Sequence, residues 1–378
     1  MTNKSQMNYI KIFINFFKKV FLIVLLTFIF TLIIDFFFGK KILSLTDKFW
    51  SKTNFYDRLL RVDHKIYHHT LRPNITYSYA QGFDGYFNLC TDNHGFRYKC
   101  NAEPRNKNFY YGFIGDSFTE GASVNYEHSF VGLFEKSLNK KVANLGVVSY
   151  GTKIYYAKLN DLITNKDYKF NHIIVGIDIS DLYDDDVYYV LNQNLEVDEN
   201  YSRVKNLRLR KILRRHFPFT NYYFFVLKQF RTSEELITKG KTPVFHPKAN
   251  LKASWTYSKK ELINGYVSST KEAQNNMILT MNKVYDLLKE NNIKMSLLIY
   301  PWPQQLKNKD LNSKHVEMWN KFCIDKCENF INLFPSFEKE LKNNNFIDVY
   351  KKYYYWNDVH FNKKGNQLVA NELLKVLN

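Results

Sequence analysis

Hydrophobic residues along this chain gather first in one long run and then in four short ones. The long run covers residues 20–38 (VFLIVLLTFIFTLIIDFFF), close to the ~20 apolar residues with which a helix crosses ~30 Å of hydrocarbon. Only Asp35 interrupts it, near one end, where a carboxylate reaches the membrane interface. The pattern predicts an uncleaved transmembrane anchor at 20–38, preceded by a cytoplasmic tail at 1–19.

Two alternatives to this anchor fit the pattern less well. A buried core helix seldom runs this long without a polar face. A cleaved signal peptide has an apolar run of ~7–15 residues and small residues at its cleavage site, whereas GKKILS follows the run here.

The four short runs predict buried strands of a parallel sheet. They are FYYGFI, VANL, HIIVGI and MSLLIY. Helical periodicity predicts helices at residues 126–139, 153–162, 270–290 and 363–377, the last with Asn362 as its N-cap. Short buried strands alternating with helices are typical of an α/β fold in which helices cover a parallel sheet.

The rest of the chain divides around this pattern. Residues 39–105 are rich in polar and turn-forming residues, which predicts a stalk and a loop-rich lead-in to a domain at 106–378. Between residues 182 and 266 the pattern is irregular and aromatic, which predicts an insertion or lid within that domain. No repeat of 20–50 residues is present, so the domain is not a solenoid.

The charge balance favours an anionic neighbour. The 54 Lys+Arg and 36 Asp+Glu give a net charge of +18, although a bias toward AT-rich codons also supplies lysine. The sequence contains no zinc-ligand spacing, recognition-helix pattern or aromatic RNA-binding motif, so we expect no nucleic-acid partner. Lysines flank the apolar run almost equally, and they leave its orientation open: Lys4, Lys11, Lys18 and Lys19 precede it, and Lys40, Lys41, Lys48 and Lys52 follow it.

The four cysteines favour one orientation. Cys90 and Cys100 are ten residues apart, and Cys323 and Cys327 are four apart. Two local pairs are what an oxidising compartment joins, so we expect the body on the periplasmic or extracytoplasmic side of the cell inner membrane. The alternative is four free thiols in a cytosolic protein.

A first candidate for chemistry follows the first short run, in GFIGDSFTEG. Gly115, Asp116 and Ser117 stand between a predicted strand and a predicted helix. This turn presents Ser117 at the carboxyl edge of the sheet, where α/β folds bind ligands and where N–H groups can stabilise an oxyanion. The alternative role for the serine is an N-cap.

A second candidate lies near the end of the chain, in YYWNDVHFNKKG. Asp358 and His360 precede the last predicted helix. Residues i and i+2 of an extended segment share a side, so Asp358 can orient the His360 ring and leave Nε2 free to accept a proton from serine. Serine with an oriented histidine is the arrangement of nucleophilic hydrolysis.

These two blocks resemble the SGNH hydrolases, also called GDSL-type lipases and esterases. Gly115, Asp116 and Ser117 match the first block of the family, and Asp358 and His360 match its last block. The resemblance covers residue 108 to the carboxyl terminus and implies a three-layer α/β/α sandwich. It further implies Ser117 as nucleophile, His360 as base and acid, and Asp358 as the residue that orients the ring. The anchor and lead-in look like those of membrane-tethered bacterial members.

The middle blocks of the family match less closely. NLGVVSYGT offers Gly146, Ser149 and Gly151 as backbone oxyanion donors beside the N–H of Ser117. Where the family has an asparagine, this chain has GIDISD. A carboxylate opposes an oxyanion unless it is protonated, so Ser180 is a safer donor there than Asp178 or Asp181.

The last block also departs from the commonest family pattern. An aspartate usually stands three residues before the histidine, where this chain has Asn357. The aspartate two residues before it resembles the members that act in bacterial polysaccharide O-acetylation.

Four further groups of residues have weaker patterns. Asp184, Asp185 and Asp186 follow Asp181, and we expect a solvated loop there and no metal site. Trp302 and Gln304 either contact a sugar or pack in the core. His64, His68 and His69 receive no role. A run of basic residues either binds anionic lipid or an acidic glycan, or is simply the exposed face of a helix. Its members are Arg203, Lys205, Arg208, Arg210, Lys211, Arg214 and Arg215.

The sequence therefore predicts a membrane-anchored serine esterase or O-acyltransferase that acts on acyl (acetyl) esters of cell-envelope glycans. Its partners are an acylated glycan or small acyl ester and, through residues 20–38, membrane lipid. No cofactor is expected. The alternative from another class is an inactive protein of the same fold that binds glycan or scaffolds a polymer-export complex.

Overall fold

The computed structural model describes residues 2–45, 60–82, 85–200, 216–220 and 243–377. The chain divides into two compact units. One contains residues 1–50 and 204–239, and the other contains residues 51–203 and 240–378. We describe each unit by itself.

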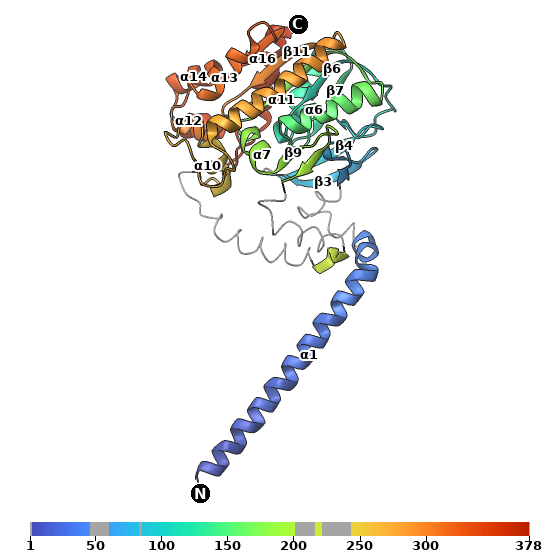
Figure 1. Ribbon diagram of the computed structural model, residues 1–378, viewed down its shortest axis with the longest axis vertical. Helices are drawn as coiled ribbons and strands as arrows, with labels where there is room; N and C mark the ends of the chain where they lie inside the picture. The colour runs from blue at the N-terminus through green and yellow to red at the C-terminus, as the bar shows by residue number, and fades with distance from the viewer. Residues whose placement is uncertain (1, 46–59, 83–84, 201–215, 221–242, 378) are drawn as a thin grey trace. The chain divides into compact units, whose positions relative to one another are not determined.

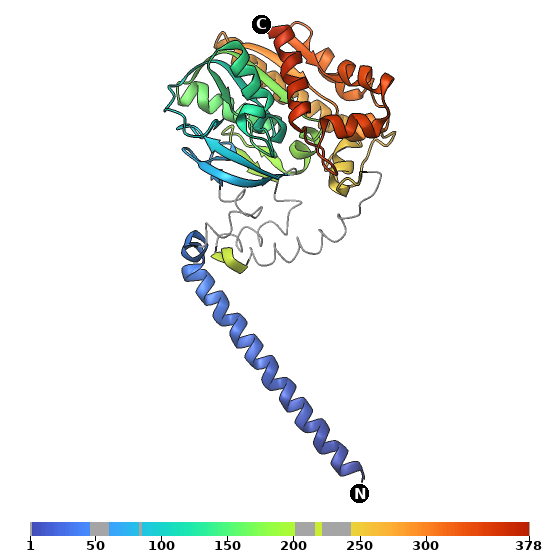
Figure 2. The same ribbon diagram turned by 180° about the vertical axis from the view of Figure 1, so that it is seen from behind.

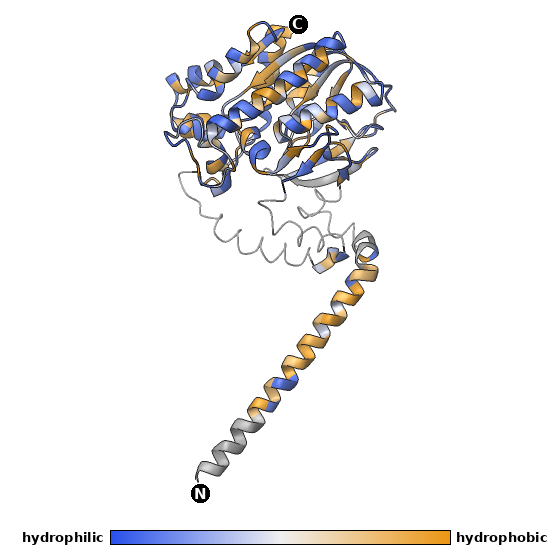
Figure 3. Ribbon diagram, in the orientation of Figure 1, coloured by the Kyte–Doolittle hydropathy of each residue, from blue (hydrophilic) through white to orange (hydrophobic). Residues whose placement is uncertain are grey.

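The first unit contains the long helix α1 (Thr2–Leu45). Its stretch Phe13–Gly39 is long and apolar enough to cross a membrane, and Figure 3 shows the apolar residues along it. Most of the large hydrophobic side chains in this stretch are exposed. The apolar stretch thus begins seven residues earlier than the anchor predicted at 20–38.

Asp35 is buried within the first unit. It is 2% exposed, and its carboxylate accepts the backbone N–H groups of Phe219 and Thr220 at 2.9 and 2.6 Å. The Asp35 carboxylate is thus hydrogen-bonded within its own unit, and its place at a membrane interface stays a prediction.

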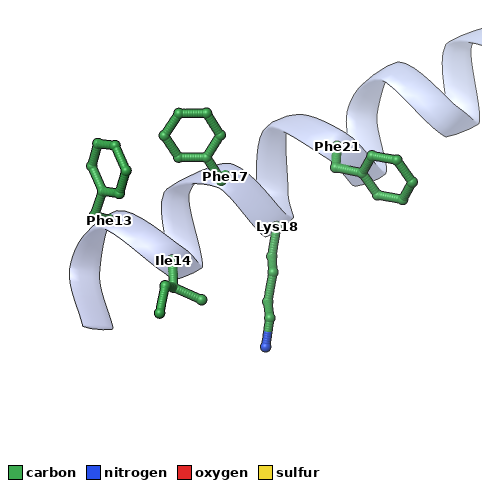
Figure 4. A pocket seen from close by; sticks show the side chains of 5 residues that line it. All are labelled: Phe13, Ile14, Phe17, Lys18 and Phe21. Carbon is green, nitrogen blue, oxygen red and sulfur yellow. The ribbon is translucent and has the colours of Figure 1, made fainter. Parts of the chain in front are cut away.

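A hollow of about 450 Å³ follows one side of α1. Figure 4 shows that one helix supplies all of its walls, through Phe13, Ile14, Phe17, Lys18 and Phe21. It is the spacing between side chains on an exposed apolar helix, so we do not treat it as a ligand site.

The second unit is built on a five-stranded parallel sheet. The strands run in the order β12-β11-β8-β6-β7, and every neighbouring pair is parallel. Four of these strands contain the predicted short runs, and β12 was not predicted, because NFIN is short and only one of its residues is buried. The strands are β6 (Asn108–Ile114), β7 (Val142–Asn144), β8 (Lys169–Ile177), β11 (Lys294–Ile299) and β12 (Asn329–Asn332).

Helices cover both faces of this sheet, as Figures 1 and 2 show from opposite sides. On one face α5 (Phe130–Leu138) packs against α16 (Lys363–Leu377), and on the other α6 (Thr152–Asn160) packs against α11 (Thr270–Glu290). The three-layer α/β/α arrangement is thus confirmed. Strands covered on both faces are apolar at nearly every position, which is why β8 and β11 appear in the sequence as unbroken hydrophobic runs.

The remaining helices connect these layers. Asn362 caps α16 as predicted, because its Oδ1 accepts the N–H groups of Lys364 and Gly365 at 2.9 and 3.1 Å. The connecting helices are α4 (Ser117–Glu120), α7 (Asp181–Val187), α10 (Pro247–Ala253), α12 (Pro303–Lys307), α13 (Lys314–Cys323), α14 (Phe334–Asn343) and α15 (Phe346–Tyr353).

The expected stalk is largely part of the second unit. Most of its described residues, from Leu60 on, form antiparallel strands, and Arg97 is buried with its guanidinium bonded to the carbonyls of Asn88 and Val124 at 2.8 and 2.9 Å. The boundary expected at residue 105 therefore does not separate two units. The strands are β1 (Arg61–His64), β2 (His68–Leu71), β3 (Thr76–Gly82), β4 (Gly85–Thr91) and β5 (Arg97–Tyr98).

The segment expected as an insertion is divided between the two units. The described residues 216–220 group with α1, whereas α7, α10 and the small antiparallel pair β9 (Tyr189–Leu191) and β10 (Val197–Glu199) belong to the sheet unit. Helix α11 packs on α7. The part of this segment that belongs to the sheet unit thus packs against the helices of that unit.

Both predicted disulfides form. Cys90 is bonded to Cys100 and Cys323 to Cys327, with Cα–Cα distances of 5.1 and 4.8 Å. The first bond joins the end of β4 to the chain after β5, and the second closes the turn after α13. Each pair is close in sequence, so pairing is decided by local geometry.

Candidate active site

The turn between β6 and α4 positions Ser117. Gly115 has no room for a side chain, because a Cβ there would lie 2.1 Å from Thr119 Oγ1 and 2.9 Å from the carbonyl oxygen of Gly176. Asp116 caps α4 by accepting the N–H of Phe118 at 3.0 Å. The serine therefore starts the helix, at the carboxyl end of a central strand, with its side chain turned toward the loop before α16.

That loop brings Asp358 and His360 to the serine. His360 Nδ1 lies 2.5 Å from Asp358 Oδ1, and His360 Nε2 lies 2.8 Å from Ser117 Oγ. Asp358 Oδ1 also accepts the backbone N–H of His360 at 2.9 Å. With a proton on Nδ1 shared with the carboxylate, the Nε2 lone pair faces the serine hydroxyl, as a general base requires.

Side chains that the sequence did not single out hold this loop. The Tyr350 hydroxyl lies 2.6 Å from the carbonyl oxygen of Tyr355 and 2.8 Å from that of Asp358, and it accepts the N–H of Asp358 at 2.9 Å. The Phe118 ring packs against the His360 ring, with centroids 4.8 Å apart. Tyr350 stands in the tyrosine-rich stretch VYKKYYYW, where no local pattern marks one tyrosine as different from the others.

Electrostatic interactions shift the pKa values of His360 and Asp358 in opposite directions. Burial opposes the charge on His360, but the charge and hydrogen bond of Asp358 outweigh it, so the pKa of His360 is raised. Burial likewise opposes the charge on Asp358, and His360 outweighs it, so the pKa of Asp358 is lowered. The pair therefore favours a charged aspartate beside a histidine that readily holds a proton.

A cluster of three buried carboxyl groups lies behind the nucleophile. Asp116, Asp178 and Asp181 each offer an oxygen within 4.8 Å of the others. Asp116 Oδ2 accepts the Ser117 hydroxyl at 3.1 Å. Burial and the charge of Asp178 raise the pKa of Asp116 to about 8, and burial with both neighbours raises that of Asp181.

Burial therefore favours the protonated form of Asp116 near neutral pH. Protons reduce the negative charge that would otherwise oppose an oxyanion at Ser117. Protein donors also occupy part of the cluster, because Trp302 Nε1 donates to Asp178 Oδ2 at 2.5 Å and the Tyr155 hydroxyl donates to Asp181 Oδ2 at 2.8 Å. The spacing suits a cation, but acidic groups alone do not define a metal site, and we assign none.

The candidate oxyanion donors separate into free and engaged groups. The N–H of Gly146 donates to Asn144 Oδ1 at 3.1 Å, and the N–H of Ser180 donates to Asp178 Oδ1 at 2.6 Å. Within the described part of the chain, the N–H groups of Ser117, Ser149 and Gly151 have no hydrogen-bond acceptor. The N–H of Ser180 is therefore not available to an oxyanion, because Asp178 Oδ1 already accepts it.

Hydrogen bonds from several segments, among them the lead-in, hold the loop that carries Ser149. Ser149 has a φ of +64°, its carbonyl accepts the Tyr189 hydroxyl at 2.6 Å, and His69 Nε2 lies 2.9 Å from the carbonyl of Val148. Glu120 Oε2 accepts the N–H of Val148 at 2.8 Å. His69, to which the sequence gave no role, therefore supports the loop of the free donors.

Two other expectations are resolved by burial. Trp302 and Gln304 are 4% and 3% exposed, so the core alternative holds and neither forms a sugar-binding surface. The acidic run is no solvated loop: it lies on α7, where Asp184 pairs with Lys252 at 2.6 Å and Asp185 accepts the N–H of Thr152 at 3.0 Å. The basic run at 203–215 lies outside the described residues.

Comparison with known proteins gives structural likeness only. No protein-family model matches the chain, and no curated protein matches it in sequence. A lipolytic protein of the G-D-S-L family from Veillonella parvula is similar at 13% identity over 71% of this chain and 97% of its own, with a TM-score of 0.39. An acetylxylan esterase from Geobacillus stearothermophilus is similar at 12% identity over 71% and 93%, with a TM-score of 0.37.

A second lipolytic protein of the G-D-S-L family, from Desulfitobacterium hafniense, is similar at 13% identity over 72% of this chain and 100% of its own, with a TM-score of 0.36. These TM-scores lie below 0.5, so the functional proposal rests on the geometry of this chain.

Proposed function

We propose that this chain is a membrane-anchored serine esterase or O-acyltransferase of SGNH type that acts on acyl (acetyl) esters of cell-envelope glycans. One observation carries the proposal: the continuous hydrogen-bonded series from Asp358 through His360 to Ser117, with 2.5 and 2.8 Å between successive side-chain atoms. Serine, histidine and aspartate in this order are the parts of a nucleophilic acyl-transfer site.

The chemistry follows from the positions of these atoms. His360 Nε2 takes the proton of the Ser117 hydroxyl as Oγ attacks the ester carbonyl. The N–H of Ser117 and that of Ser149 or Gly151 stabilise the oxyanion. His360 then returns the proton to the leaving alcohol oxygen, which leaves an acyl group on Ser117. Asp358 holds the ring and stabilises its charged form throughout.

The second half of the reaction decides between hydrolysis and transfer. Water or a glycan hydroxyl loses its proton to His360 and attacks the acyl carbon, and Ser117 regains its hydroxyl. Both acceptors use the same residues, so the proposal includes both activities.

The proposed location rests on two features. The stretch Phe13–Gly39 is apolar and largely exposed, which suits lipid. The two disulfides suit an oxidising compartment. Together they favour a single-pass protein of the inner membrane with its sheet unit on the extracytoplasmic side, where envelope glycans lie.

A specific observation favours the second candidate, a glycan-binding or scaffolding protein without activity. Asp178 stands in the third block, where the SGNH family has an asparagine, and the Ser180 N–H already donates to Asp178 Oδ1, so that N–H does not supply the third oxyanion donor of the family.

A fluorophosphonate probe applied to the full chain in detergent distinguishes the two candidates. We expect covalent labelling at Ser117 that is absent from Ser117→Ala. A folded chain whose Ser117 stays unlabelled at high probe concentration supports the inactive protein.

A further inference from the structure

A polar pocket of about 280 Å³ lies beside the candidate active site, in the sheet unit. Its walls come from β4, from the chain that follows α4, and from the segments on either side of the His360 loop. Its volume is near the lower end of small-molecule sites, ~300 Å³, and suits one sugar-sized group.

Hydrogen bonds connect this pocket to the catalytic loop. Tyr355, in the pocket wall, donates its N–H to the carbonyl of His360 at 3.0 Å. Its hydroxyl donates to the carbonyl of Ser123, also in the wall, at 3.1 Å. Ser123 follows the nucleophile helix by three residues. A ligand in the pocket is therefore next to the two segments that carry Ser117 and His360.

The charged side chains in the pocket wall are all lysines. Lys351 and Lys352 come from the end of α15, and Lys363 and Lys364 begin α16. Lys352 is paired with Glu340 at 2.8 Å. In the part of the chain that the structure describes, no carboxylate pairs with the other three.

The lysine side chains, and not the helix end, are the available donors. Asn362 already accepts the backbone N–H groups of Lys364 and Gly365. Tyr86 adds an aromatic ring that is 57% exposed, a surface against which sugar C–H groups pack. Ammonium groups beside an exposed ring suit a sugar that carries a negative charge.

We propose that this pocket binds an anionic substituent of the glycan substrate, a sugar-borne carboxylate or phosphate, adjacent to the ester that reacts. The inference rests on the proposed function and narrows its substrate class to acidic glycans. An anionic lipid surface would also attract lysines, but the pocket adjoins the catalytic loop, and this position favours a group on the substrate.

The kinetic test compares two charge-matched double variants of the full chain in neutral detergent. Lys363→Gln with Lys364→Gln alters the pocket, and Lys271→Gln with Lys289→Gln removes two exposed lysines of α11. Substrates are acetylated oligogalacturonate, acetylated oligo(glycerol phosphate), acetylated xylo-oligosaccharide and p-nitrophenyl acetate. Carboxylate and phosphate are thus tested separately, beside a neutral glycan and a small ester.

We expect the pocket variant to raise KM for at least one anionic substrate roughly five- to tenfold at low salt, as two exposed ion pairs allow. The increase shrinks in 0.5 M salt. We expect kcat for every substrate, and KM for the two neutral substrates, to change less than twofold. The α11 variant should have the kcat and KM values of the parent. Equal KM changes for anionic and neutral substrates, or none, overturn the inference.

A binding arm decides the inference if the chain turns over no ester. In a Ser117→Ala background, calorimetry measures binding of oligogalacturonate, oligo(glycerol phosphate) and phosphatidylglycerol vesicles with and without the pocket substitutions. If the pocket substitutions weaken binding of a soluble oligomer, the proposed anion site is supported. This holds even if the chain does not hydrolyse p-nitrophenyl acetate and the proposed function fails. Unchanged oligomer binding, or weakening of vesicle binding alone, overturns it.

Discussion

At the scale of single residues, the site combines a reactive serine with groups that control charge around it. Ser117 Oγ lies between His360 Nε2 and Asp116 Oδ2, at 2.8 and 3.1 Å. One of these partners is a base oriented by Asp358, and the other is a carboxyl group whose pKa is raised to about 8 by burial and Asp178. The serine thus has one effective proton acceptor near neutral pH.

Replacing Ser117 by alanine should abolish ester turnover and leave the fold intact. Loss of the nucleophile lowers kcat on the order of 10⁶-fold in serine hydrolases. Ser117 is buried, and removing its hydroxyl takes away one hydrogen-bonding group, so we expect the free energy of unfolding to change by about 1 kcal/mol. Hydrolysis of p-nitrophenyl acetate and thermal melting measure the two effects. Ser137→Ala, on the exposed side of α5, is the control, and an active Ser117→Ala chain would rule out this nucleophile.

Replacing Asp358 by asparagine should lower kcat and shift the pH profile. The base works only when His360 is neutral, and Asp358 raises the pKa of His360, so the activity of the parent rises with pH through a value above 6.5. Without the carboxylate the pKa of His360 falls, and the rise moves to lower pH. The lost orientation should lower kcat roughly 10⁴-fold.

The measurement for Asp358→Asn is kcat/KM from pH 5 to 9. Asp348→Asn, on the exposed side of α15, serves as the matched control. An unshifted profile with parental kcat would contradict the role given to Asp358.

At the scale of elements, the candidate site depends on how a few turns are fixed. The β6–α4 turn is shaped by Gly115, and the loop before α16 is held by hydrogen bonds from Tyr350 and Asn362. These two elements are more than 200 residues apart in sequence, and helix α16 packs on α5, which follows the nucleophile. Packing of α16 against α5 therefore helps keep serine and histidine at hydrogen-bond distance.

Tyr350→Phe tests the support of the histidine loop. Loss of the hydroxyl frees the carbonyls of Tyr355 and Asp358 and should cost about 1 kcal/mol of stability. We expect kcat/KM to fall roughly 10- to 100-fold, because small displacements of catalytic groups carry large rate penalties. Stopped-time ester assays and melting curves measure both, with Tyr110→Phe, at a 42% exposed position, as control. Unchanged kcat/KM would show that the loop is held without this hydroxyl.

At the scale of the whole molecule, the two units have features that suit different environments. One presents an exposed apolar helix, and the other has a hydrophobic core between two helical layers and two disulfides. An apolar exterior suits lipid, whereas disulfides persist only where thiols are oxidised. The proposed single-pass topology satisfies both conditions at once.

The redox state of the chain in its native membrane tests this topology. Alkylation with a mass-tagged maleimide before and after reduction should label no cysteine before and all four after. Denaturation before alkylation controls for burial, because Cys90 and Cys323 are buried. Four cysteines that alkylate without reduction would return the sheet unit to the cytoplasm.

The sequence alone determined the features that depend on local pattern. The apolar run, four of the five sheet strands, helices α11 and α16 with the Asn362 cap, and both cysteine pairings follow from periodicity, capping and short spacing. Such features depend on interactions between residues near one another in the chain. The serine turn and the Asp358–His360 pair were predictable for the same reason.

Only the tertiary structure decided which polar groups are buried together. In the folded chain the acidic run of α7 contacts Lys252 and Thr152, and the Ser180 N–H donates to Asp178. The lead-in also contacts the loop of Ser149, through His69. The fold also places four lysines around one pocket beside the His360 loop. Hydrogen bonds between distant segments carry no periodic signal in a sequence, because each depends on how the sheet and its covering helices bring remote residues into contact.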